Sequence, residues 1–272
     1  MAWPSEQLLT SPWFAALRPT LARLAWDQFP SPQDWRALPE ALRPSNAMGR
    51  PIHFLPPEEL AEAGYEQRIF ETGMVATRTD NWHDAFNALC WLSWPHAKAA
   101  LNALHVAELA QQADSLRSRV RDRATLFDES GLVLACVDAH LAKALRGQEW
   151  QRLFVEQAGE WGRGLQPYLF GHALLEKGLA PYIGVTGRAW VIEIAPAWLA
   201  MSEADKIAVL DQQLAQAIAA GDLAHGVTLH PLPMLGIPGW WPVQDAAFYA
   251  DETHFRLRRH AAHLGSGVVR HG

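Results

Sequence analysis

Apolar residues recur at helical spacing most clearly in two adjacent stretches near the middle of the chain. In residues 82–93 they fall three or four positions apart, and Asp80 or Thr79 stands before them as a candidate N-cap. Pro95 lacks a backbone N–H and clashes with the preceding turn, so it ends this helix and begins a second one that continues toward residue 116. The pattern therefore predicts a pair of packed central helices.

Shorter apolar runs bounded by Gly, Asp and Thr predict strands on both sides of the helix pair. The runs with strand character are residues 65–71, 74–77, 124–127, 132–137, 182–185 and 189–194. Asp128 to Gly131 separates two of them and is expected to form a hairpin turn. Ser202 precedes the clearest amphipathic helix, residues 203–220. We predict an α+β fold with helices packed on a largely antiparallel sheet of hairpins; the alternative is an α/β sheet.

Length and composition favour a single globular domain over residues 1–260, followed by a flexible tail over residues 261–272. Apolar residues make up 49% of the chain and charged residues 19%, which is typical of a globular protein. The Pro-rich run 230–242 is too interrupted to be regular structure, and we expect either a lid or wall beside a site or a structural strap.

Charge and cysteine content limit the partners and the compartment. The formal net charge is -6, which argues against a nucleic-acid-binding protein because such proteins usually carry a basic surface. Cys90 and Cys136 lie in apolar runs and form no CxxC unit, so we expect two buried thiols in a reducing compartment. The first residues do not resemble a signal peptide, and no apolar stretch approaches membrane-spanning length. The prediction is a cytoplasmic protein that does not interact with membranes.

Polar residues lie beside the apolar stripe on both central helices. On the first helix they are His83, Asp84 and Asn87, and on the second they are Lys98, Asn102 and His105. One interpretation is a shared cleft in which His83 and Asp84 carry protons or bind a metal, while Asn87, Lys98, Asn102 and His105 bind substrate. The other is a polar network that orients two packed helices. The spacing matches no specific metal motif.

A second candidate lies in residues 167–178, PYLFGHALLEKG, which are predicted as one helix from Pro167 to Gly178. His172 and Glu176 stand at i and i+4, a spacing that suits two ligands of one metal or a carboxylate that orients an imidazole. A plain side-chain hydrogen bond fits equally. We predict a divalent metal held by His83, His172 and Glu176. Asp128 and Glu129 are a further carboxylate pair, although acidic residues are also ordinary turn formers.

Four segments resemble an uncharacterised bacterial family, the domain of unknown function numbered three thousand and twenty-five. The segments are NWHDAFNALCWLSWPHAKAALN (81–102), RATLFDESG (123–131), FGHALLEK (170–177) and PLPMLGIPGWWP (231–242). The resemblance extends over residues 10–258 and implies a soluble bacterial protein. It implies no activity and no catalytic residue.

Two classes of function remain open from the sequence. The first is a metal-assisted or acid-base hydrolase of a small polar or phosphorylated compound, with His83, Asp84, His172 and Glu176 as catalytic residues. The second is a non-catalytic module that binds a small molecule or a protein through a groove rich in tryptophan, of which the chain has 13.

Overall fold

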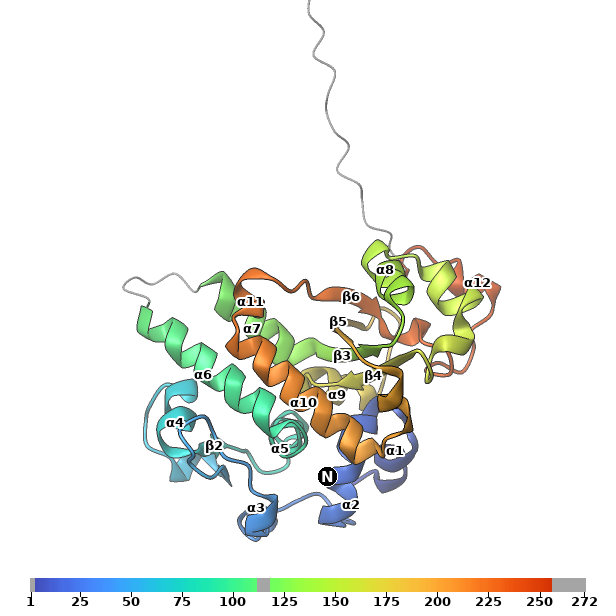
Figure 1. Ribbon diagram of the computed structural model, residues 1–272. Coiled ribbons are helices and arrows are strands. Elements are labelled where there is room, and N and C mark those ends of the chain that lie inside the picture. Colours follow the sequence, from blue (N-terminus) through green and yellow to red (C-terminus); the bar gives the residue numbers. More distant parts are fainter. Residues whose placement is uncertain (1–2, 112–117, 256–272) are drawn as a thin grey trace, which may run out of the picture.

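The computed structural model describes residues 3–111 and 118–255 of the chain, so the predicted tail over residues 261–272 lies outside the described residues. A four-stranded sheet with the strand order β4-β3-β5-β6 forms its centre (Figure 1). The strands are β3 (Gly131–Cys136), β4 (Leu165–Leu169), β5 (Thr186–Glu193) and β6 (His230–Pro233). β3 and β5 run parallel, while both edge strands pair antiparallel to their neighbours. The sheet is therefore mixed.

Strand β3 is buried on both faces, which explains its uninterrupted apolar sequence. Leu132, Leu134 and Cys136 point into one hydrophobic cluster, and Val133 and Ala135 point into another. Helices must therefore cover the sheet on both sides. Those of at least eight residues are α4 (Tyr65–Thr72), α5 (Trp82–Ser93), α6 (Pro95–Gln111), α7 (Arg119–Ser130), α8 (Ala139–Gly147), α9 (His172–Leu179) and α10 (Glu203–Ala219).

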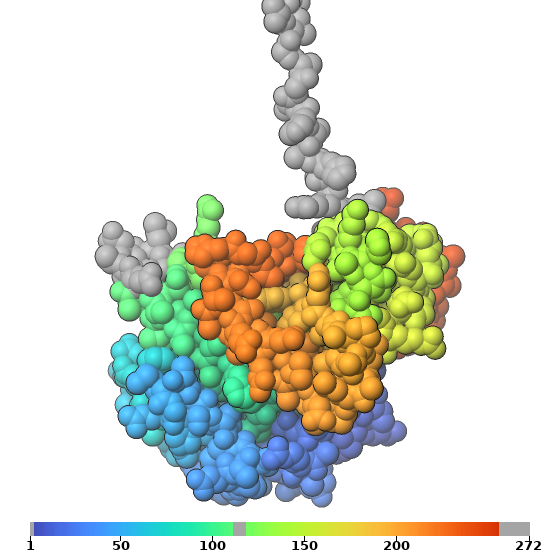
Figure 2. Space-filling view, in the orientation of Figure 1, coloured from blue at the N-terminus to red at the C-terminus, as the bar shows by residue number. Residues whose placement is uncertain are grey.

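The two hydrophobic clusters divide the helices between the two faces. Apolar residues of α5, α8 and α9 belong to the first cluster, and those of α6, α7 and α10 contribute to the second. α10 packs along α6, and the space-filling view shows these two segments, orange and teal, in direct contact (Figure 2). Shorter helices complete the shell: α1 (Ser5–Thr10), α2 (Arg18–Leu24), α3 (Pro32–Arg36), α11 (Asp222–His225) and α12 (Ala246–Tyr249).

A small parallel sheet of β1 (His53–Leu55) and β2 (Met74–Ala76) lies beside α4 and leads directly into α5.

None of the described helices combines the length and the apolar character that a membrane crossing requires. Cys90 and Cys136 are both free and buried, as predicted.

Several predictions from the pattern are confirmed. The fold is α+β, the central helix pair breaks at Pro95, and α10 begins after Ser202, whose hydroxyl accepts a hydrogen bond from the N–H of Asp205 at 3.2 Å. Residues 132–137 and 74–77 are strands within one residue at each end. Each of these elements combines a strong apolar period with a matching boundary residue.

Two predicted strands are helices instead. Residues 65–71 belong to α4, which ends at Gly73 in a left-handed conformation with φ of 77°. Residues 124–127 belong to α7, so Asp128 to Gly131 is the end of a helix that enters β3 directly and not a hairpin turn. Short apolar runs have no distinctive period, because a buried strand and one buried turn of helix look alike at that length.

The predicted helix over residues 167–178 is also wrong, because it divides into β4 and α9. Pro167 cannot donate a backbone hydrogen bond, and it is tolerated because β4 is an edge strand. Of the two strands predicted between residues 182 and 194, residues 189–194 fall largely in β5, whereas residues 182–185 form a turn before it. The Pro-rich run begins with the other edge strand, β6, and continues as a 3-10 turn, Met234–Gly236.

Candidate functional site

The first turn of α5 is positioned by a cap and an ion pair. Asn81 is the N-cap, with its side-chain oxygen 3.0 Å from the N–H of Asp84, so the prediction of Asp80 or Thr79 at this place is wrong by one or two residues. Asp84 accepts two hydrogen bonds from the Arg78 guanidinium and one from its backbone N–H, each at 2.8 Å. These contacts fix the connection from β2 to α5 and so the position of His83.

The junction of α7 with β3 meets the junction of β4 with α9 at one end of the sheet. Because β3 and β4 are antiparallel, the start of β3 lies beside the end of β4. The carbonyl of Gly131 accepts hydrogen bonds from the N–H groups of Phe170 and Gly171, at 3.0 and 2.8 Å. This pairing places Glu129, the second-last residue of α7, next to His172, the first residue of α9.

The close approach of these two junctions requires glycine at position 171. A Cβ atom there would lie 2.5 Å from the Gly131 nitrogen and 2.6 Å from the Glu129 carbonyl. We expect Gly171→Ala to lower the free energy of unfolding by about 1–3 kcal/mol, since backbone must move to admit the methyl group. Urea unfolding measures this, with Gly159→Ala as the control because no atom lies within 4 Å of a Cβ there. Equal stability of the two variants would contradict the assigned packing.

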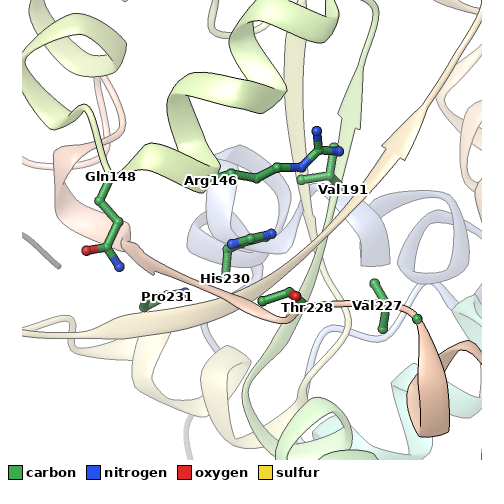
Figure 3. A pocket seen from close by; sticks show the side chains of 8 residues that line it. Arg146, Gln148, Val191, Val227, Thr228, His230 and Pro231 are labelled. Carbon is green, nitrogen blue, oxygen red and sulfur yellow. The ribbon is translucent and has the colours of Figure 1, made fainter. Parts of the chain in front are cut away.

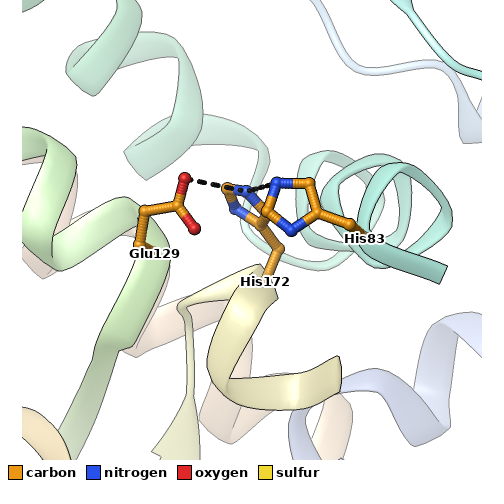
Figure 4. A group of neighbouring side chains, drawn as sticks. All are labelled: His83, Glu129 and His172. Atoms are coloured by element: carbon orange, nitrogen blue, oxygen red, sulfur yellow. Dashed lines mark hydrogen bonds and ion pairs between the residues drawn. The ribbon is translucent and has the colours of Figure 1, made fainter. Parts of the chain in front are cut away.

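His83, Glu129 and His172 bring three potential metal ligands together (Figure 4). One nitrogen or oxygen atom from each lies within 4.8 Å of the other two. The two Nε2 atoms are 3.0 Å apart, and Glu129 Oε1 is 3.6 Å from His172 Nε2. Two Zn–N bonds of about 2.0–2.1 Å in tetrahedral geometry separate the nitrogens by about 3.3 Å, so the observed spacing is close to that of a metal site.

A carboxylate faces the other nitrogen of each imidazole. Glu176 Oε2 lies 3.4 Å from His83 Nδ1, and Asp128 Oδ2 lies 3.7 Å from His172 Nδ1. Both distances are long for a direct hydrogen bond, but the negative charge favours a proton on each Nδ1. With a proton on each Nδ1, both Nε2 atoms present lone pairs to one another across 3.0 Å instead of forming a hydrogen bond.

Burial favours the neutral forms of two members of the cluster, His172 and Glu129. Burial lowers the pKa of His172 to about 4, and the Asp128 carboxylate only partly opposes this effect. Burial also raises the pKa of Glu129, and the neighbouring Asp128 adds to the increase against the attraction of His83. A neutral imidazole is the form that binds metals, and a dication would favour the ionised form of Glu129.

A buried hydrogen-bond network supports the cluster from the α6 side. Lys98 is buried, and its Nζ donates to Asp128 Oδ1 at 2.5 Å and to Asn87 Oδ1 at 2.9 Å. Asn87 Nδ2 in turn donates to the hydroxyl of Tyr65 at 2.9 Å. Burial alone would raise the pKa of Asp128, but Lys98 and His172 outweigh it and lower the pKa overall. The network therefore keeps a charged carboxylate beside His172.

A cavity of about 390 Å³ opens beside these residues. Of the residues predicted from the sequence, those that line it are His83, Asp84, Asn87, His105 and His172. Lys98 and Glu176 contact lining residues without lining the cavity themselves. Asn102 likewise contacts a lining residue without lining the cavity, because its amide donates to the backbone and side-chain oxygens of Glu66, at 2.9 and 2.8 Å.

Three predicted roles change with this placement. Asp84 forms an ion pair with Arg78. Burial alone would raise the pKa of the Asp84 carboxyl, but the hydrogen bonds and charge of Arg78 outweigh it and lower the pKa. Asp84 therefore stabilises the loop before α5 and is poorly suited to carry protons. Glu176 approaches His83 and not His172, although the i, i+4 spacing pointed to the latter. It lies outside the group of three ligands, in which Glu129 stands where Glu176 was predicted.

Sequence reasoning missed Tyr65 and Glu66 and treated Asp128 and Glu129 mainly as turn formers. All four line the cavity. Tyr65 and Glu66 were hidden by the incorrect strand over residues 65–71. The acidic pair directly before the strongly apolar β3 was an available signal, because a carboxylate at the end of a strand or helix can reach the edge of a sheet.

A second cavity of about 370 Å³ lies across β5 and β6, beside the end of α8 (Figure 3). Arg146, Gln148, Val191 and His230 are among its lining residues, and none of the predicted site residues lines it. The Pro-rich run contributes His230 and Pro231 here and does not line the cavity at His83. A lid or wall role for this run at the candidate site is therefore wrong.

The comparisons with known proteins identify a family and no activity. No curated protein and no solved structure matches the chain. A family model described as "Protein of unknown function (DUF3025)" matches residues 52–259, which begins later than the predicted resemblance over residues 10–258. Three of the segments that carried the resemblance supply His83, Glu129 and His172. The chain belongs to the DUF3025 family.

Proposed function

We propose that this protein is a metal-dependent hydrolase whose ion is held by His83, Glu129 and His172. The observation that carries the proposal is the convergence of both Nε2 atoms at 3.0 Å while a carboxylate faces each Nδ1. Without a cation, the contact between the two Nε2 atoms is a hydrogen bond, so one neutral imidazole must carry its proton on Nε2. The Nδ1 atom of that imidazole then has no proton to direct toward the carboxylate that faces it. A metal ion removes this conflict, and a carboxylate behind a histidine ligand is the usual support for such an ion.

Three protein ligands leave one position of a tetrahedral ion free, as in zinc hydrolases. An ion held by these three residues would lower the pKa of a water molecule to about 7 and so would supply a hydroxide nucleophile. Glu66 also lines the cavity, and burial raises the pKa of its carboxyl group. A carboxylate of raised pKa is suited to take the proton from the water and return it to the leaving group.

The direct test is metal binding by the full-length protein, which also decides between Glu129 and Glu176. We expect about one Zn²⁺ or similar ion per chain after loading and dialysis, measured by mass spectrometry of the elements. Glu129→Gln removes a ligand and is expected to weaken binding by about 10²–10³-fold. Glu176→Gln removes only the support of His83 and is expected to weaken it by about 10–100-fold.

His140→Ala is the matched control, because His140 is exposed, does not line the cavity at His83 and is not one of the three potential ligands. Its metal content should equal that of the wild type. A larger effect of Glu176→Gln than of Glu129→Gln would restore Glu176 as the ligand, as the sequence predicted. Absence of stoichiometric metal in wild-type protein would contradict the metal site and the hydrolase with it.

The competing function is a non-catalytic binding module, and one observation favours it. Trp161, Tyr168 and Trp240 line a separate cavity of about 360 Å³. No tryptophan lines the cavity at His83 among the described residues. Ligand binding that survives both His83→Ala and His172→Ala and is lost in Trp240→Ala would support the binding module.

A further inference from the structure

We propose that the substrate of this hydrolase is an uncharged carbonyl compound, an amide or an ester, whose carbonyl oxygen accepts a hydrogen bond from Tyr65. This inference rests on the proposed metal site. It selects one of two substrate classes, because the same metal chemistry also serves phosphate esters.

The first observation is the fixed orientation of the Asn87 amide. Its oxygen accepts a hydrogen bond from the Lys98 ammonium at 2.9 Å, so its NH₂ group is the end that faces Tyr65. The phenol oxygen of Tyr65 is consequently an acceptor in that contact. The hydroxyl proton of Tyr65 must then point to a different partner.

The second observation is the absence of a protein acceptor for that proton. Within residues 3–111 and 118–255, no oxygen or nitrogen accepts a hydrogen bond from Tyr65, although its side chain lines the cavity. Tyr65 as a whole residue is 42% exposed, whereas burial of its hydroxyl end, and then the nearby Glu66 and Asp128 carboxylates, raise the pKa of the hydroxyl above its ordinary value. Tyr65 therefore stays protonated at every physiological pH and presents a donor to the cavity.

The third observation is the distance along α5. Asn87, which holds Tyr65, lies one helical turn from His83 on the same face, a spacing of about 5–6 Å between Cβ atoms. A small substrate at the open metal position can therefore reach the Tyr65 hydroxyl. If a hydroxide supplied at that site added to the carbonyl carbon, the carbon–oxygen double bond would become a C–O⁻ single bond, and the Tyr65 hydroxyl, as a fixed donor at that oxygen, would stabilise the charge.

The charge of the cavity disfavours a phosphate ester. Four carboxylates line it, namely Glu66, Asp84, Asp128 and Glu129. Arg78 is the cation that lines it, with Lys98 directly behind, and both are already paired with Asp84 and Asp128. A bound dication brings this set to about neutral, whereas sites for phosphate dianions present unpaired Arg or Lys donors.

The experiment uses two probes on the full-length, metal-loaded protein, followed by calorimetry. Acetohydroxamate offers a carbonyl oxygen next to a metal-binding group, and inorganic phosphate represents the other class. We expect acetohydroxamate to bind more tightly than phosphate, and Tyr65→Phe to weaken acetohydroxamate by about 3–10-fold, the effect of one lost hydrogen bond. Metal content should be unchanged in Tyr65→Phe. Tyr182→Phe is the control, because Tyr182 is exposed at 54% and lines none of the cavities described above.

The outcomes separate the two proposals. The carbonyl assignment would be overturned if phosphate bound more tightly than acetohydroxamate, or if wild type and Tyr65→Phe bound acetohydroxamate equally. The proposed hydrolase would still stand in either case, provided that the protein binds a stoichiometric metal. A wild-type protein that takes up no metal would overturn both. A Tyr65→Phe variant that loses metal as well as probe would show that Tyr65 supports the site through Asn87 and is no substrate donor.

Discussion

Lys98→Ala is expected to lower the free energy of unfolding by about 3–5 kcal/mol, the cost of leaving a buried charge without its partner. Lys98 and Asp128 are both largely removed from water, with side chains exposed at 5% and 20%. The ammonium also lies 5.6 Å from the centre of the Trp91 ring, so its stem fills space between α5 and α6. Urea unfolding of purified, metal-free protein measures the loss.

A double variant distinguishes the stability lost by leaving a buried charge unpaired from the stability lost by removing the packing of the Lys98 side chain. Lys98→Met with Asp128→Asn removes both charges and keeps most of the volume, so we expect it to recover more than half of the lost stability. Arg152→Ala removes an exposed ion pair with Glu149 and should cost less than about 1 kcal/mol. If Lys98→Ala costs as little as Arg152→Ala, the buried network contributes nothing to stability.

The metal-free protein is expected to lose about 2–3 kcal/mol of stability between pH 6.5 and pH 4 through His172 alone. Burial lowers the pKa of His172 to about 4 in the folded state, against about 6.5 in the unfolded chain. Between these two values the unfolded state binds more protons, so the free energy of unfolding falls as the pH falls. Below pH 4 both states are protonated and the loss stops.

This effect is isolated by subtraction. The difference in unfolding free energy between wild type and His172→Phe, measured with chelator from pH 7 to pH 4, removes the contributions of the carboxyl groups that do not interact with His172; Asp128 and Glu129 do interact with it. It should change across that interval in the direction of a weaker wild type at low pH. Parallel pH profiles for the two proteins would show that His172 titrates normally and is not desolvated.

The Lys98→Ala prediction and the His172 prediction depend on the same property of the site: several ionisable side chains lie close together and are buried. Such groups cost stability unless they are paired, so a polar cluster of this kind is retained either for structure or for chemistry. Lys98 is the partner of Asp128, whereas the two facing Nε2 atoms of His83 and His172 are held either by a hydrogen bond from one imidazole to the other or by the cation proposed above.

The sequence by itself determined the elements with a long apolar period and a clear boundary. α5, α6 and α10 were predictable because Pro95 and Ser202 mark their starts and their apolar positions repeat over several turns. The same period placed His83 and Asn87 on one flank of a helix, so part of the site was visible before the fold was known. The family resemblance also came from the sequence.

Only the tertiary structure decided which side chains meet. His83 and His172 are separated by 89 positions, and Glu129 reaches them because β3 pairs antiparallel with β4, a fact that no local pattern contains. Glu176 lies outside the group of three potential ligands and faces Nδ1 of His83, although its i, i+4 spacing from His172 made it the better candidate in the sequence. Helical spacing fixes which residues share a face, but the packing of the elements fixes what that face touches.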